Sequence, residues 1–169
     1  MNAVLNPVAA TLTPPAHGEV WPGQGGRYVC TLPALMGVPE RHLIVSDGEA
    51  EDLQYGPYGL DVPNTKSHLD GPGNTLALID SGKDHPAAKW ARAYTADGHS
   101  DFYLPSRLDL VMAHICCPQL FSKDDWYWSS TQFSSNFAFV QGFEDGYSYW
   151  GSKGYERRVR AFRWVHLST

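Results

Sequence analysis

The stretch "DDWYWSSTQFSSNFAFVQGFEDGYSYW", residues 124–150, decides which fold class the sequence favours. Large and small side chains alternate over residues 137–142, which is the period of a half-buried strand. The Asp-Gly pair at 145–146 is a strong signal for a tight hairpin turn, and residues 147–150 supply the return strand. The stretch therefore predicts a β-hairpin, and it holds ten of the 22 aromatic residues of the chain.

Two helices are predicted upstream of this hairpin. The sequence "DHPAAKWARAY" has Pro86 near the first helical position and predicts a helix near residues 85–95. In "LPSRLDLVMAHICC", Ser106 is a candidate N-cap with Asp109 three residues later, which predicts a helix over residues 106–117. No other segment has a convincing helical pattern.

The remaining regular structure is predicted to be β. Short strands are expected at residues 27–32 and 41–47, and "RRVRAFRWV" (157–165) alternates as a strand does. Residues 49–74 contain mainly turn-forming residues and are expected to form a long loop. The pattern indicates an α+β fold, in which two helices pack on an antiparallel sheet built largely from residues 126–165.

Oxygen-bearing side chains in the long loop raise the question of a calcium site. The residues concerned are Asp61, Asn64, Asp70 and Asn74. Their spacing matches no EF-hand loop, and Asx turns explain the same residues. The sequence also lacks the ligand spacings of zinc sites, so we expect no metal and no cofactor.

Length and composition indicate one folded domain. The chain has 169 residues, of which 43% are hydrophobic and 18% charged, and it predicts a single domain over residues 19–169 after an extended Pro-rich arm over residues 1–18. The net charge is −5 and the excess of basic residues is confined to residues 151–169, which argues against general nucleic-acid binding. No apolar run is long enough for a membrane span, and no basic, apolar leader is evident.

The motifs of common enzymes are missing. No Gly-x-Ser-x-Gly, His-x-x-x-His or Cys-x-x-Cys pattern occurs, and the seven histidines are dispersed. Cys116 and Cys117 end the second predicted helix, where the helix C-terminus raises a thiol pKa and disfavours a nucleophile. Together with Cys30 they are interpreted as free structural thiols of a protein made in a reducing cytoplasm. We therefore predict that the chain is not an enzyme.

Three landmarks together carry a family resemblance: "DFYLPSRLDL" (101–110), "YWSST" (127–131) and "RVRAFR" (158–163). They resemble the C-terminal domain family of the collagen-like adhesin Lcl over about residues 18–165, and "GGRYV" with "HPAAKWA" looks like its phage-type members. The resemblance implies a C-type-lectin-like fold, with two helices on a small twisted antiparallel sheet and a long loop region. The residue triplets of calcium-dependent sugar-binding lectins are absent, so calcium-mediated sugar recognition is not expected.

The aromatic stretch is also the predicted ligand surface. Trp128 and the hydroxyl residues after it are interpreted as core, whereas the rings, serines and asparagine of the flanking loops have the composition of an antibody paratope. The predicted binding residues are Phe133, Asn136, Tyr147, Tyr149, Trp150 and Tyr155.

The expected function is that of a non-enzymatic binding module encoded by a phage or prophage. It would be made in the bacterial cytoplasm without a signal peptide and act on the virion as a receptor-binding, surface-binding or decoration protein. Its partner would be a protein or a cell-surface glycan, and a homo-oligomer or virion assembly is compatible with this role. One alternative is an intracellular phage protein that inhibits a host defence or regulatory protein. Another is an enzyme related to the formylglycine-generating group, whose cysteines are separated rather than vicinal.

Overall fold

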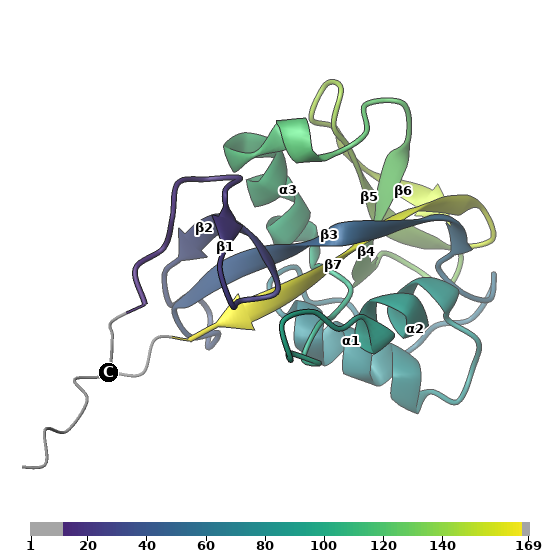
Figure 1. Cartoon of the computed structure of the whole chain (residues 1–169). Helices are drawn as coiled ribbons and strands as arrows, with labels where there is room; N and C mark the ends of the chain where they lie inside the picture. Colours follow the sequence, from purple (N-terminus) through teal and green to yellow (C-terminus); the bar gives the residue numbers. More distant parts are fainter. Residues whose placement is uncertain (1–11, 167–169) are drawn as a thin grey trace, which may run out of the picture.

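Two long strands, β3 (Arg41–Gln54) and β7 (Glu156–Val165), pair antiparallel along most of their length and form the middle of the sheet. The structure is a computed structural model that describes residues 12–166. β3 comes from the first third of the chain and β7 from its end, so the pairing unites strands that are distant in sequence (Figure 1).

The strands lie in the order β1-β2-β3-β7-β4-β5-β6. Every neighbouring pair is antiparallel except β4 and β7, which run parallel and are bridged at Tyr127 and Arg158. The seven-stranded sheet is therefore mixed. Its other strands are β1 (Val20–Trp21), β2 (Gly26–Leu32), β4 (Trp126–Gln132), β5 (Phe137–Gly142) and β6 (Ser148–Ser152).

Helices cover both faces of this sheet. α3 (Arg107–Cys116) lies on one face, while α1 (Gly71–Asp80) and α2 (Pro86–Ala93) lie on the other, above and below β3 and β7 in Figure 1. A short 3-10 turn, η1 (Pro118–Leu120), follows α3. The predicted C-type-lectin-like fold, with two helices on a small antiparallel sheet, is therefore wrong. The sheet is larger, mixed and covered by three helices.

Capping signals explain where two of the helices begin. α2 starts at Pro86, whose fixed φ and missing N–H suit the first helical position. At α3, the Ser106 hydroxyl accepts a hydrogen bond from the Asp109 amide, and the Asp109 carboxylate accepts one from the Ser106 amide at 2.9 Å. This reciprocal pair is a capping box. Both predicted helices are confirmed.

α1 is the helix that the sequence patterns missed. Its first turn, Gly-Pro-Gly-Asn, contains residues that disfavour helices and that typically form turns. In the structure Asp70 Oδ1 accepts a hydrogen bond from Gly73 N at 2.8 Å, so the acidic residue before the glycines is a helix cap. Leu78 is fully buried, and this packing outweighs the weak propensity of the first turn.

β3 is also longer than predicted, because it does not end at the Asp-Gly pair 47–48. The register between β3 and β7 shifts between Val45 and Glu49, so this pair lies in an irregularity rather than in a hairpin turn. There the Ser46 hydroxyl donates to Gly48 O at 2.6 Å and accepts from Ala161 N at 3.1 Å, which supports the distorted ladder. The prediction of a loop over residues 49–74 is therefore wrong at both ends.

The two faces of the sheet carry separate hydrophobic clusters. Tyr127 and Phe162 belong to the cluster beneath α3, and Trp128 belongs to the cluster beneath α1 and α2. Since neighbouring residues of a strand point to opposite faces, Tyr127 and Trp128 anchor both clusters from β4. Trp128 is fully buried and its Nε1 donates to Leu53 O at 2.9 Å, which confirms its interpretation as a core residue.

The predicted N-terminal arm is described in part, because residues 1–11 lie outside the described residues. Within the described part, Gly18 N donates to Tyr28 O at 2.8 Å and Tyr28 N donates to Glu19 O at 3.0 Å. These residues therefore cover part of the outer edge of β2. None of the helices within residues 12–166 is long and apolar enough to cross a membrane.

We expect Trp128→Ala to lower the free energy of unfolding by about 3–5 kcal/mol, because it removes a fully buried indole and leaves a cavity between α2 and the sheet. Trp150→Ala, which removes an indole that is 39% exposed, should cost about 1 kcal/mol or less. Urea denaturation of the two variants measures both values. Equal losses would contradict the assignment of Trp128 to the core and Trp150 to the surface.

Candidate binding surface

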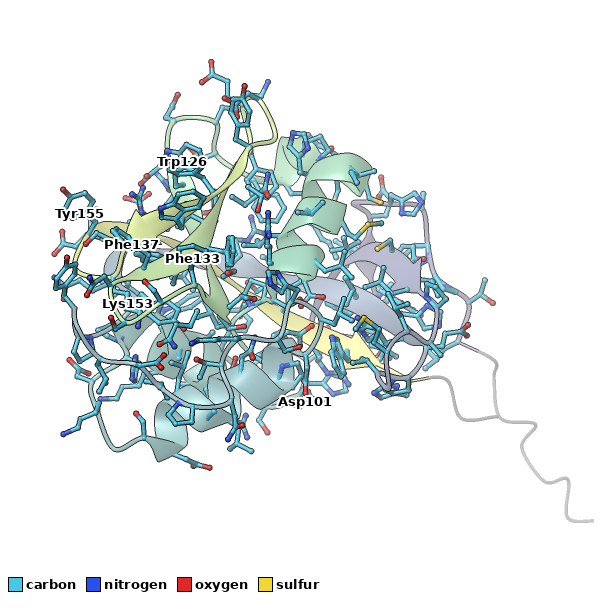
Figure 2. All side chains as sticks on the ribbon, turned by 180° about the vertical axis from the view of Figure 1, so that it is seen from behind. Asp101, Trp126, Phe133, Phe137, Lys153 and Tyr155 are labelled. Atoms are coloured by element: carbon cyan, nitrogen blue, oxygen red, sulfur yellow. The ribbon has the colours of Figure 1, made fainter. Side chains whose placement is uncertain are left out.

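The edge of the sheet at β6 carries three stacked aromatic rings, from Phe133, Trp150 and Tyr149, which we call the aromatic ladder. Trp150 pairs with Phe139 in the register of β5 and β6, and Phe133 follows directly after β4. The Phe133 amide donates to Phe137 O at 3.0 Å, which fixes the turn that presents its ring. Figure 2 shows Phe133 and Phe137 on the back of the molecule relative to Figure 1.

The rings of the ladder lie nearly parallel. The Phe133 and Trp150 centroids are 5.0 Å apart at 13°, and those of Trp150 and Tyr149 are 4.4 Å apart at 15°. Phe139 supports Phe133 in an edge-to-face contact at 5.6 Å. All three rings of the ladder remain exposed, by 46% for Phe133, 39% for Trp150 and 53% for Tyr149. Trp150 lies in the middle of the ladder and stacks on both neighbours, while Phe133 and Tyr149 form its two ends.

The other predicted binding residues lie around the ladder without joining it. Tyr147 is exposed at the β5–β6 turn, and Tyr155 is exposed at the turn between β6 and β7. Figure 2 shows Tyr155 at the periphery, beyond Phe137. Asn136 is half-buried in the β4–β5 turn, where its carbonyl accepts a hydrogen bond from Lys153 N at 3.0 Å. The six predicted residues thus comprise one stack of three rings and three separate neighbours.

A polar group that the sequence patterns missed lies beside the ladder. Arg107, the first residue of α3, places its guanidinium 4.2 Å from the Phe139 ring centroid and donates from Nε to Ser148 Oγ at 2.7 Å. His68 also contacts Phe139, and the centroids of the two rings are 5.2 Å apart. Burial, and secondarily Arg107, lowers the pKa of His68, so the imidazole is neutral near pH 7.

A buried polar network fixes the backbone that carries the ladder. Lys153 is fully buried, and its Nζ donates to Gln132 Oε1 and to Leu60 O, each at 2.6 Å. Gln132 donates from Nε2 to the Asp61 carboxylate and accepts from Val62 N at 3.1 Å. Since Gln132 precedes Phe133 and Lys153 follows β6, the network holds both backbone segments of the ladder against the loop after β3.

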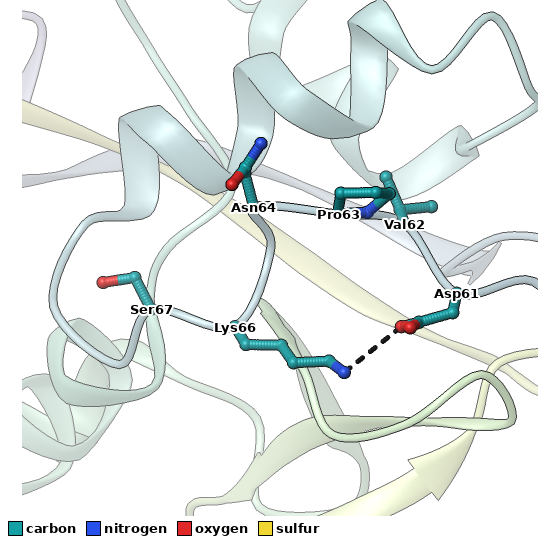
Figure 3. A pocket seen from close by; sticks show the side chains of 6 residues that line it. All are labelled: Asp61, Val62, Pro63, Asn64, Lys66 and Ser67. Atoms are coloured by element: carbon teal, nitrogen blue, oxygen red, sulfur yellow. Dashed lines mark ion pairs between the residues drawn. The ribbon is translucent and has the colours of Figure 1, made fainter.

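A hollow of about 520 Å³ opens beside this network (Figure 3). It is lined by Asp61, Val62, Pro63, Asn64, Lys66 and Ser67. Lys66 Nζ lies 3.3 Å from Asp61 Oδ1 in an ion pair whose two side chains are more than half exposed, and such pairs contribute little to stability. All of the lining comes from one loop segment and includes no aromatic ring, so the ladder is the better ligand surface.

Three of the four residues considered for calcium have other partners, and the fourth, Asn64, lines the hollow. Asp61 belongs to the network with Gln132, and Asp70 caps α1. Asn74 is buried, with Nδ2 donating to Ser67 O at 2.7 Å. Across residues 12–166, no group of three or more His, Cys, Asp or Glu side chains is placed to hold a metal ion.

The acid and thiols with the most perturbed pKa values lie in the core beneath α3, away from the ladder. Burial raises the pKa of Asp109 to about 6, although the capping hydrogen bonds oppose this. Burial also raises the pKa of Cys30 and brings that of Cys117 to about 12, so both thiols stay protonated. The three cysteines are free, and Cys116 is half-buried.

No family model matches this chain, and no curated protein matches it. A solved structure of similar fold is that of a fimbrial protein from Bacteroides ovatus, with a TM-score of 0.52 and 15% sequence identity. The similarity covers 72% of this chain and 35% of the fimbrial chain, so this chain spans about a third of that protein's length. At this identity the likeness concerns the fold alone, and it replaces the expected C-type-lectin-like architecture. The resemblance to the Lcl family stays a prediction.

We expect Lys153 to make stability rise with pH between about 8 and 10.5. Burial lowers its pKa from 10.5 to about 8, so in this range the unfolded chain binds the proton that the folded chain has lost. Folding is thereby favoured as pH increases, by up to about 3 kcal/mol for this shift. Lys153→Met removes the group, so the wild type should gain stability relative to this variant across the range in urea titrations. Parallel stability curves would contradict the shifted pKa.

Proposed function

We propose that this chain is a non-enzymatic binding module and that the aromatic ladder is the centre of its ligand surface. The observation that carries the proposal is the exposure of three stacked rings on a sheet edge. Large apolar side chains at such an edge promote aggregation, and where they are exposed together they mark an interaction site. Exposed Trp and Tyr residues that are rigidly held are typical centres of binding energy.

Rigidity is the second support for this proposal. The rings support one another, Phe139 supports Phe133, and the buried Lys153–Gln132 network fixes the two backbone segments beneath them. A surface that is ordered before binding loses little conformational entropy when a ligand arrives. The polar groups around it, Ser148 and Asn136 among them, offer hydrogen bonds at the rim of the surface.

The setting of the binding module rests on the sequence resemblance. We propose a phage- or prophage-encoded protein carried on the virion, where it binds a protein or cell-surface glycan or decorates the particle, alone or as a homo-oligomer. The fold shared with a fimbrial protein favours a surface-associated role. Mass spectrometry of purified particles tests this setting. Absence of the chain from the particles would favour the alternative, an intracellular inhibitor of a host protein that uses the same ladder.

We expect Trp150→Ala and Tyr149→Ala to weaken binding of the labelled protein to host cells, or to a captured host partner, at least tenfold. The reason is that loss of a central exposed ring typically costs about 2 kcal/mol or more of binding energy. Met36→Ala is the matched control, because Met36 is 85% exposed in the turn between β2 and β3. Titration by flow cytometry measures all three. Unchanged binding in both ladder variants would refute the proposed surface.

A further inference from the structure

The geometry of the ladder discriminates between two kinds of partner, given the proposed function. A sugar ring binds an aromatic side chain by lying flat on an open ring face. In the ladder Trp150 stacks on Phe133 and on Tyr149. The central indole is therefore less open to a sugar than an isolated ring would be, and a rigid group of three exposed rings suits a hollow on a protein surface.

Two arginines flank the ladder, and neither forms an ion pair with a carboxylate of the described residues. The first is Arg107, whose side chain lies over Phe139 and makes one hydrogen bond, to Ser148, the residue before Tyr149. Among the described residues, no carboxylate lies within 4.0 Å of its guanidinium. Its charge is thus not neutralised by this protein.

The second flanking arginine is Arg157, on the other face of the sheet. Its guanidinium lies against Gly151, the residue after Trp150. A Cβ atom added to Gly151 would lie only 3.0 Å from Arg157 Nε. The rings of Trp128 and Tyr155 lie 5.5 and 6.0 Å from it. Its Nε is buried and lacks a hydrogen-bond partner, whereas its two terminal nitrogens are reached by solvent.

The Nε atoms of Arg41 and Arg158 are also buried without a partner, but Arg157 alone among the arginines of residues 12–166 makes no hydrogen bond through any of its side-chain nitrogens. On the same strand, Arg158 binds Glu49 at 2.6 Å, Arg160 donates to Leu120 O at 2.6 Å, and Arg163 binds Asp101 at 2.5 Å. Arg157 makes no hydrogen bond and no ion pair. Burial lowers its pKa, and the carboxylate of Asp125, which lies beyond ion-pair distance, opposes this shift. Holding a partly buried cation without a partner is unfavourable, and a carboxylate from outside would relieve that cost.

We propose that the partner is a protein that presents an acidic segment across β6, so that its carboxylates bind Arg107 and Arg157 on the two sides of the ladder. The two arginines meet β6 at Ser148 and Gly151, and so bracket the Tyr149-Trp150 pair. Apolar contact with the ladder supplies affinity, while the paired charges set the position and the identity of the partner. This inference rests on the proposed function of the ladder.

The test uses two peptides and NMR of the full chain. The probes are Ac-Asp-Glu-Asp-Glu-NH2 and its neutral match Ac-Asn-Gln-Asn-Gln-NH2, followed through the Nε–H signals of the arginines and the indole signal of Trp150. We expect saturable chemical-shift changes at Arg107, Arg157 and Trp150 with the acidic peptide but not with the neutral one. Added salt should weaken the binding of the acidic peptide. Arg157→Gln and Arg107→Gln should each raise its dissociation constant at least tenfold. Arg27→Gln should not, because Arg27 already binds Asp47 at 2.7 Å.

Arg157→Lys keeps the positive charge but loses the planar fork, so it should fold normally and bind several-fold more weakly than wild type. Equal shifts with the neutral peptide, or acidic-peptide binding that survives Arg157→Gln, would overturn the inference. Free glucuronate that binds as well as the peptide would replace the protein partner by an acidic glycan. If Trp150→Ala abolishes cell binding while Arg157→Gln and Arg107→Gln retain it, the acidic segment is wrong and the ladder's function stands.

Discussion

The antiparallel pairing of β3 with β7 is the constraint on which the rest of this structure depends. β2 and β1 extend the sheet from β3, whereas β4, β5 and β6 extend it from β7 through a single parallel bridge at Tyr127 and Arg158. The helices then pack on faces that both groups of strands create. One outer edge is formed by the short strand β1 and by the part of β2 that the N-terminal segment covers, and the opposite edge, at β6, carries the aromatic ladder. The two edges of the sheet therefore differ: one is covered by the chain itself, and the other carries the proposed ligand surface.

Local signals were sufficient for the elements whose hydrogen bonds are local. Pro86 at the start of α2 and the capping box of α3 lie within the elements they define, and both helices are where the sequence predicts them. The β5–β6 hairpin also forms, although residues 143–147 connect its strands in a longer loop than a two-residue Asp-Gly turn. β3 could not be predicted to its full length, because its second half is held by β7 and crosses an Asp-Gly pair that looks like a turn. α1 begins with residues that favour turns, and the burial of Leu78 decides in favour of the helix. Each error follows from tertiary pairing that overrides local propensity.

The candidate site, like the fold, could be predicted only in part. Composition identified the exposed rings of the aromatic stretch, because paratope-like residues cluster there in sequence, and the structure stacks Phe133, Trp150 and Tyr149. Composition could not identify what supports or flanks them. Lys153 binds Leu60 and Gln132, which are 93 and 21 residues away, and Arg107 reaches Ser148 across 41 residues. The unpaired state of Arg157 is a property of its surroundings in space, and the run of arginines in β7 gives no sign of which one lacks a partner.

The distance in sequence between β3 and β7 also has a kinetic consequence. More than half of the chain separates the paired residues of β3 and β7. The entropy of closing that loop is therefore lost before the hydrogen bonds between the two strands compensate for it. The β5–β6 hairpin closes locally and can form early. While the chain is being synthesised, one edge of β3 stays unpaired, and with it the apolar run Leu43, Ile44 and Val45 is open to strands of other chains. The interval of greatest aggregation risk therefore ends with the synthesis of β7, after the β5–β6 hairpin is complete.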